Sequence, residues 1–252
     1  MVVIALTSFA GAPGVTTAAT ALAVHWPRPV LLVEADTNAV SSLMTGFFRS
    51  NLRTTDGGIE KLAFAFSRDS LEAEDLLDSD YGLSIPVHDL PPIPTMPIPA
   101  IPDGHKMWVI PGFVNLGVVD GVRSLWAKLP RLLGALADGG IDVIVDLGHL
   151  DIDDDRLPLV DTADRVVVSA TASMVDLNRT YRRLELSDLN DRARAPGSER
   201  YWTLLNTTVS ERIPAREFST HVLPVLATLP HDPSGAACSH TGDQTPSDPE
   251  RL

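Results

Sequence analysis

The stretch Ser8–Thr20, SFAGAPGVTTAAT, follows the apolar run Val2–Leu6 and precedes a segment with helical periodicity. A strand, a turn with two glycines and a Thr-Thr pair, and then a helix is the order found in a phosphate-binding loop. In such a loop, backbone N–H groups at a helix N-terminus converge on an anion, and a lysine with a Ser/Thr hydroxyl completes the site. Here Val15 follows Gly14 where the lysine is expected. The stretch therefore indicates a fold, and it leaves open whether a nucleotide still binds.

Seven segments are continuous apolar runs rich in β-branched residues, a pattern typical of parallel strands buried on both faces. They are Val2–Thr7, Pro29–Val33, Met107–Ile110, Asp142–Asp146, Arg165–Ser169, Tyr201–Asn206 and Val225–Leu229. Helical patterns alternate with them, at Thr16–His25, Gly58–Phe66, Val122–Ala137, Ser173–Arg192 and Pro214–Val222. This alternation predicts an α/β fold with a doubly wound, mostly parallel sheet flanked by helices.

The composition is that of a folded protein without an export or membrane segment. The 252 residues include 44% hydrophobic and 21% charged side chains, and the net charge of −13 argues against a surface that coats nucleic acid or anionic lipid throughout. The one cysteine, Cys238, fits a reducing compartment. No run reaches the roughly 18 apolar residues of a membrane span. We therefore expect a cytoplasmic protein without direct membrane insertion.

Two segments interrupt the alternation of strands and helices. The proline-rich stretch Ile85–Pro102 cannot form a helix or a central strand, so we expect an extended excursion, either a surface insertion or a proline-rich ligand of a partner. Residues 235–252 are small, polar and proline-containing, which predicts a disordered tail. Residues 1–234 are then expected to form a single domain.

Polar residues stand where several of the predicted strands end. Glu34 and Asp36 follow one buried strand, Asp146 ends another and is followed by Gly148, and Asn206 ends a third. Ends of parallel strands meet at the carboxyl edge of the sheet, where ligands bind in open α/β folds. Asp146 has the form of an acid that orients Mg²⁺ through water, and the Asn206 amide has the groups needed to read a base edge.

In this order the segments resemble the ParA/MinD-type deviant-Walker ATPases, which are P-loop NTPases of the SIMIBI class. The resemblance runs over residues 2–233 and includes the Gly11–Thr17 loop, Val109–Gly112 (VIPG), Val166–Leu184, Leu204–Asn206 and Leu229–Pro233 (LPHDP). It implies ATP sandwiched between two protomers.

The resemblance also implies roles by position. The nucleotide contacts would come from Gly11, Gly14, Val15, Thr16, Thr17, Asn206 and Pro230. Asn206 and Pro230 would contact adenine, and Thr16 and Asp146 would be the metal-side residues for Mg²⁺. Asp36 would be the catalytic residue that positions the attacking water.

The loop departs from the family pattern at the positions that matter for phosphate binding. The family reads Lys-Gly-Gly-x-Gly-Lys-Thr-Thr, whereas the same positions here are Ala10–Thr17, AGAPGVTT. Both lysines are absent, at Ala10 and Val15. Ala12 opposes a left-handed backbone, and Pro13 removes one N–H donor. Glu34 also stands where the family usually has aspartate.

These departures predict weak nucleotide binding. A charge-assisted hydrogen bond contributes roughly 1.5–3 kcal/mol, so loss of the lysine at position 15 weakens phosphate binding about ten- to hundredfold. We expect little or no ATPase activity. Weakly bound ATP or ADP with Mg²⁺ and no cofactor at all both stay open.

Two charged segments have more than one interpretation. Asp151, Asp153, Asp154 and Asp155 do not fit a calcium loop, because the sixth and twelfth positions are Arg156 and Thr162 instead of glycine and glutamate; we favour a solvated acidic loop. The arginines at 179, 182, 183, 192 and 194 interleave with acids, which favours an exposed, salt-bridged helix over a DNA contact.

The favoured hypothesis is a positioning, scaffolding or regulatory factor in partitioning, secretion, pilus or conjugation machinery. It would act as a homodimer, or as a heterodimer with an intact paralogue, on a protein partner. One alternative is an active ATPase of chromosome or plasmid partitioning. The other is a DNA-binding partitioning factor that works without ATP.

Overall fold

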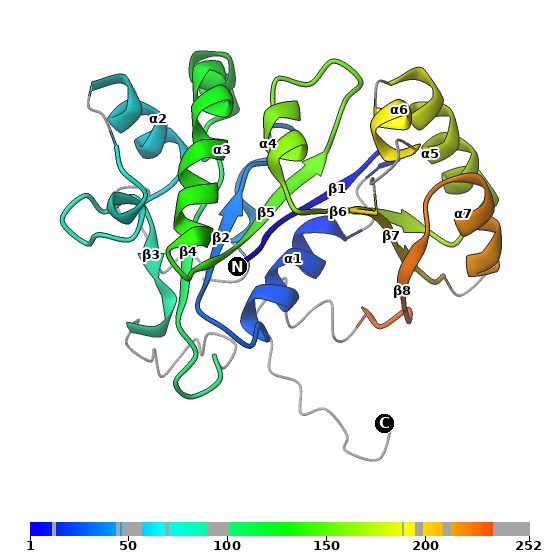
Figure 1. Cartoon of the computed structure of the whole chain (residues 1–252), viewed down its shortest axis with the longest axis horizontal. Coiled ribbons are helices and arrows are strands. Elements are labelled where there is room, and N and C mark those ends of the chain that lie inside the picture. Colours follow the sequence, from blue (N-terminus) through cyan, green and yellow to red (C-terminus); the bar gives the residue numbers. More distant parts are fainter. Residues whose placement is uncertain are drawn as a thin grey trace.

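The computed structural model describes residues 1–11, 14–43, 46, 57–68, 71–89, 101–187, 189–194, 199–208 and 213–233, without the side chains of 89, 192 and 194. Eight strands form one sheet in the order β3-β4-β2-β5-β1-β6-β7-β8 (Figure 1). Every neighbouring pair is parallel except β3–β4. The strands are β1 Val3–Ser8, β2 Val30–Glu34, β3 Ile85–Pro86, β4 Met107–Ile110, β5 Asp142–His149, β6 Arg165–Thr171, β7 Tyr201–Asn206 and β8 Val225–Leu229.

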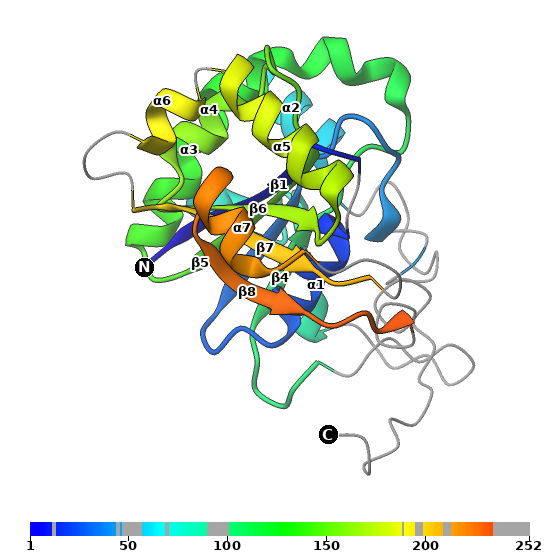
Figure 2. The same ribbon diagram turned by 90° about the vertical axis from the view of Figure 1, so that its right-hand side faces the viewer.

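Helices cover both faces of this sheet, with α1 on one side and α3, α4 and α5 on the other (Figure 2). The α-helices are α1 Val15–Val24, α2 Ile59–Arg68, α3 Arg123–Asp138, α4 Leu157–Thr162, α5 Met174–Leu186, α6 Leu189–Arg194 and α7 Ala215–His221. Short 3₁₀ segments lie at η2 Glu74–Leu76, η3 Val87–Asp89 and η4 Leu116–Val122.

Burial on both faces explains why the central strands are continuous apolar runs, but the expectation of such burial was wrong for β7, which is fully buried only at alternate positions, and for the edge strand β8, which is mostly exposed. In β5, Val143 and Val145 join the core cluster beneath α3, whereas Ile144 between them joins the cluster beneath α1. In β2, Leu31 and Leu32 divide between the two clusters in the same way. Alternate side chains of a strand point to opposite faces, so a strand covered on both faces needs apolar residues at every position.

All seven expected strands are present, and the predicted fold class is confirmed. The structure adds β3, an antiparallel edge strand at the start of the proline-rich stretch. Proline lacks a backbone N–H, and an edge strand tolerates this because it has a neighbouring strand on one side only. Val87–Asp89 then forms a 3₁₀ turn, so the expectation that this stretch excludes helix was wrong there. Residues 90–100 and the tail 235–252 lie outside the described residues.

The helix expected over Ser173–Arg192 is two helices. Helix α5 ends at Leu186 because Ser187 has extended backbone angles (φ −111°, ψ 152°), and α6 begins at Leu189. Helix α4 was not expected. Among the helices that the structure describes, none is long and apolar enough to cross a membrane.

Candidate functional site

The turn between β1 and α1 has an open helix N-terminus. Gly14 is the N-cap of α1 in a left-handed conformation (φ 68°, ψ 31°), and no side chain caps the helix. A Cβ built on Gly14 would meet no described atom within 4 Å. The first N–H groups of a helix have no intrahelical partner, and the helix dipole favours an anion beside them. Gly11 also has a positive φ of 69°, and its carbonyl accepts a 2.6 Å hydrogen bond from the Ser8 hydroxyl. Ala12 and Pro13 lie outside the described residues, so their effects stay predictions.

Val15, at the position of the expected lysine, is a core residue. Its side chain is 3% exposed and packs in the cluster beneath α1 with Leu6 and Ala19. The first helical residue therefore offers the site a backbone N–H and an apolar anchor. No cationic group extends from this position.

Asp146 lies inside β5, next to Thr16 in the first turn of α1, because the strand expected to end at Asp146 continues to His149. Its carboxyl is buried, with one oxygen accepting from the Gly148 N–H (2.9 Å) and with Oδ2 lacking any hydrogen-bond partner among the described residues. The pKa of Asp146 is raised to about 7; burial is the largest cause, the nearby Thr16 hydroxyl acts to lower it, and the neighbouring Glu34 and Asp36 act to raise it. The group is thus a buried acid with one unused oxygen, next to a threonine hydroxyl.

Glu34 is paired with Asp146 in the β2–β5 register and holds two loops together. Its carboxylate accepts hydrogen bonds from the Ser41 hydroxyl, the Ser42 N–H (3.0 Å) and the Gly112 N–H (2.8 Å). Burial nevertheless raises the pKa of Glu34 above its usual range. All these contacts are within the fold, so Glu34 joins the segment after β2 to the Val109–Gly112 turn.

Asp36 packs directly against the backbone of β5. A Cβ on Gly148 would lie 2.2 Å from Cγ of Asp36, and Gly148 has a positive φ of 57°. Only glycine fits both conditions. Burial raises the pKa of Asp36, while the Asn38 N–H and the positive charge of Arg156 act to lower it.

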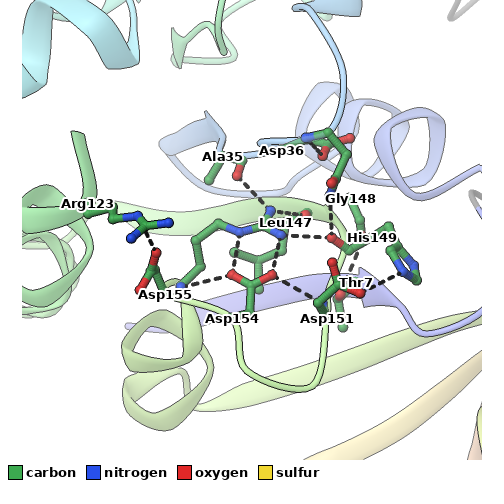
Figure 3. Close-up of polar contacts among 12 residues, drawn as sticks. Thr7, Ala35, Asp36, Arg123, Leu147, Gly148, His149, Asp151, Asp154 and Asp155 are labelled. Carbon is green, nitrogen blue, oxygen red and sulfur yellow. Dashed lines mark hydrogen bonds and ion pairs between the residues drawn. The ribbon is translucent and has the colours of Figure 1, made fainter. Parts of the chain in front are cut away.

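A buried arginine ties β2 to β5 at this edge. Arg156 is 1% exposed and donates to the carbonyls of Ala35, Leu147 and His149. Its Nε and Nη2 donate to the two carboxylate oxygens of Asp154, at 2.8 and 2.6 Å. Figure 3 shows these contacts converging between Ala35, Leu147, His149 and Asp154. The five N–H donors of a guanidinium are therefore all used inside the fold.

The paired guanidinium changes the interpretation of the acidic loop. Burial acts to raise the pKa of Asp154, but the hydrogen bonds and charge of Arg156 outweigh it and hold the pKa below its usual value. The side chain of Asp154 is only 9% exposed, against 59% for Asp151 and 54% for Asp155. The expectation of a wholly solvated loop was thus wrong for Asp154.

Asn206 and Pro230 lie beside each other at the far end of the same edge. Asn206 pairs with Leu229 in the β7–β8 register, and the Asn206 amide donates to the Ser169 hydroxyl (2.8 Å). Thr207 binds the Leu229 carbonyl and the His231 N–H, which fixes the exposed Pro230 close to the end of β7.

No known protein-family model and no curated protein matches the chain. Solved structures do match. A ParA family ATPase from Chlorobium tepidum TLS has a TM-score of 0.67 at 18% identity, over 95% of this chain and 90% of that one. The septum site-determining protein MinD of Pyrococcus horikoshii OT3, solved with Mg-ADP, has a TM-score of 0.57 at 16% identity, over 95% of this chain and 86% of that one. The Aquifex aeolicus MinC:MinD cell division complex has a TM-score of 0.54 at 12% identity, over 95% of this chain and 87% of that one.

The chain has the ParA/MinD fold. On this fold the carboxyl edge brings together most of the residues that the sequence singled out. Thr16, Asp36 and Asp146 lie around one point between β1, β2 and β5, and Gly11 and Gly14 form the adjoining turn. Asn206 and Pro230 stand apart from them, across β6.

The carboxyl edge of the sheet in this chain offers few protein ligands for Mg²⁺. Among the described residues, no group of three His, Cys, Asp or Glu side chains is arranged to hold a metal ion. Mg²⁺ usually keeps several waters and takes one or two protein ligands together with substrate phosphates. The unpartnered Oδ2 of Asp146 and the hydroxyl of Thr16 meet that smaller requirement.

Sequence reasoning missed Arg156 altogether. It treated this residue only as a mismatch to a calcium loop, because an arginine inside an acidic run suggests surface charge. The Asp154-x-Arg156 spacing, which allows a two-point ion pair directly after a buried strand, was the available signal.

The arginine-rich helix is salt-bridged only in part. Arg182 pairs with Glu185 on α5 (3.1 Å), whereas Arg183 pairs with Asp151 in the acidic loop (3.0 Å). Arg179 makes no ion pair within the part of the chain that the structure describes. The side chains of Arg192 and Arg194 lie outside that part.

Proposed function

We propose that this chain is a ParA/MinD-like protein that binds a nucleotide weakly with Mg²⁺ and acts as a positioning, scaffolding or regulatory factor. The observation that carries the proposal is that the start of α1 keeps some groups suited to binding a phosphate and Mg²⁺ but lacks the positively charged one. The open helix N-terminus and the Thr16–Asp146 pair are present, but the residue that would supply the positive charge is Val15, buried in the core.

In such a site the chain's own groups bind and orient the ligand. The free N–H groups of the first turn of α1 would receive a phosphate, and Thr16 with Asp146 would hold Mg²⁺, which neutralises phosphate charge when bound. The Asp146 carboxyl, with a pKa of about 7, would release its proton to solvent if Mg²⁺ bound beside it, since a nearby cation favours the charged form of an acid. Asn206 and Pro230 would contact the base.

The structure favours slow hydrolysis or none. Asp36 stands at the edge where a water-positioning acid is needed. Phosphoryl transfer, however, also needs positive charge on the transferring group. Arg156 is the arginine whose charge reaches Asp36, and its donors are all used by Asp154 and backbone carbonyls. It is therefore not available to a phosphate.

The role that we propose follows the proteins that share the fold. The matches include a ParA family ATPase, a septum site-determining protein MinD and a MinC:MinD cell division complex. We infer that this chain likewise acts on a protein partner, as a homodimer or with an intact paralogue.

Titration calorimetry with ATP and ADP, with and without Mg²⁺, tests the proposal. We expect a dissociation constant of about 10–100 μM, ten- to hundredfold weaker than a micromolar loop that has its lysine. Thr16→Val should abolish the Mg²⁺ dependence. Thr220→Val, which removes an exposed hydroxyl bonded to the Arg216 carbonyl on α7, should not.

Phosphate release from ATP measures the second part of the proposal. We expect no turnover above that of Asp36→Ala. Rapid turnover that Asp36→Ala abolishes would establish the alternative of an active ATPase, and no binding at millimolar nucleotide would refute the proposed ligand.

A further inference from the structure

An open hollow of about 490 Å³ lies between the start of the α1 loop and helix α5. Ala10 and Gly11 form its wall on the loop side. Arg179, Arg182 and Arg183 line it from α5, and His149 lines it from the end of β5. The hollow therefore shares one wall with the turn that ends at the N-terminus of α1.

The hollow has more positive than negative groups. Arg182 is paired with Glu185 and Arg183 with Asp151, both in exposed surroundings. Arg179 has no ion pair among the described residues. Exposed ion pairs contribute little free energy, so these guanidinium groups can exchange a surface carboxylate for a better acceptor. This excess of positive charge occurs in a chain with a net charge of −13.

The chemistry of the lining favours a phosphate ester. Arginine can bind phosphate with two parallel hydrogen bonds. A phosphate also carries more negative charge than the single surface carboxylate that it would replace. The volume lies within the range of small-molecule sites, and Phe9, Ile152 and Leu186 give the hollow an apolar side suited to the organic part of such a ligand. The adjoining loop, Phe9–Thr17, has no lysine or arginine of its own.

We propose that this hollow binds the phosphate groups of a nucleotide, with Arg179 and Arg182 supplying the positive charge that the loop lacks. The inference rests on the proposed function for the identity of the ligand as a nucleotide. Two sources provide the same phosphate chemistry. One is a nucleotide bound by the same chain, and the other is a nucleotide in the loop of a second copy that faces the hollow.

Binding of pyrophosphate and of Mg-ATP to four proteins tests the inference. They are the wild type, the double variant Arg179→Gln/Arg182→Gln, the loop variant Thr16→Val, and a matched control, Lys128→Gln/Arg131→Gln. The control removes two exposed positive charges from α3. We expect the α5 variant to weaken pyrophosphate binding tenfold or more, and the control to change it less than twofold at the same ionic strength.

A mixing experiment distinguishes a nucleotide bound by the same chain from one bound in the loop of a second copy. If the phosphates come from a second copy, a mixture of Thr16→Val and Arg179→Gln/Arg182→Gln proteins recovers Mg-ATP binding that neither protein shows alone, with a dimer visible in sedimentation. If they come from the same chain, the mixture recovers nothing.

The outcomes separate this inference from the proposed function. Mg-ATP binding that is lost in Thr16→Val but unchanged in the α5 variant would overturn the inference and leave the proposed function intact. Pyrophosphate binding that requires the α5 arginines, in a protein that binds no nucleotide, would leave a phosphate site and overturn the proposed function. Absence of binding by both probes would overturn both.

Discussion

Replacing Asp146 with asparagine should change how the stability of the protein depends on pH. The Asp146 carboxyl is 1% exposed and lies near Glu34 and Asp36, and its pKa is raised from 3.8 to about 7. Between these values the folded protein keeps a proton that the unfolded chain has lost. Stability from this group is therefore complete below about pH 4 and is lost as the pH rises to about 7.

The magnitude follows from this change in pKa. Each pKa unit corresponds to 1.36 kcal/mol, so the contribution lost between pH 5 and pH 8 is about 3 kcal/mol. Asparagine keeps the shape of the side chain and an acceptor for the Gly148 N–H, but it has no proton to lose. The free energy of unfolding of Asp146→Asn, relative to wild type, should thus rise by about 3 kcal/mol over this range.

Urea unfolding at pH 5, 6, 7 and 8, followed by tryptophan fluorescence, measures this difference without nucleotide or Mg²⁺. Asp153→Asn is the matched control, because Asp153 is exposed and the substitution removes the same charge. A difference between Asp146→Asn and wild type that is constant from pH 5 to pH 8, or that follows the control, would refute the reasoning.

Three further substitutions test the packing of the edge. Arg156→Met should lower the free energy of unfolding by about 3–5 kcal/mol in urea titrations, since it leaves a buried carboxylate unpaired; a loss below 1 kcal/mol would contradict the buried pair. Gly148→Ala should cost at least about 2 kcal/mol, because its Cβ meets Asp36, whereas Gly121→Ala, in open space, should cost far less by the same assay. Val15→Lys should lower the thermal midpoint by several degrees as it places an amine in the core, and an unchanged midpoint would show that the side chain points outward.

The central strands could be predicted because burial on both faces requires apolar residues at successive positions of the sequence. Each main strand is an apolar run, and β5 shows why, since Val143 and Ile144 face different layers. Ile85–Pro86 left no such record, because a two-residue edge strand is stabilised by one neighbour only.

The site was predictable where its acids follow apolar runs in the sequence, and it was not predictable where side chains bind the backbone. Asp36 and Asp146 were found from their positions after apolar runs, and the structure places them near each other. Besides Asp154, the partners of Arg156 are the carbonyls of Ala35, just after β2, and of Leu147 and His149 in β5, and carbonyls carry no residue identity. Similarly, nothing in the sequence alone indicates that Arg179 of α5 lines the same hollow as Gly11.

Calorimetric titration of the full chain with Mg-ATP, run in parallel with Thr16→Val, is the most direct measurement of whether the loop still binds a nucleotide without its lysine. We expect weak binding, about 10–100 μM, that Thr16→Val reduces at least tenfold. Micromolar or tighter binding accompanied by rapid hydrolysis, or binding that is the same in both proteins, would contradict the proposal that a lysine-free loop binds nucleotide through Thr16 and Asp146.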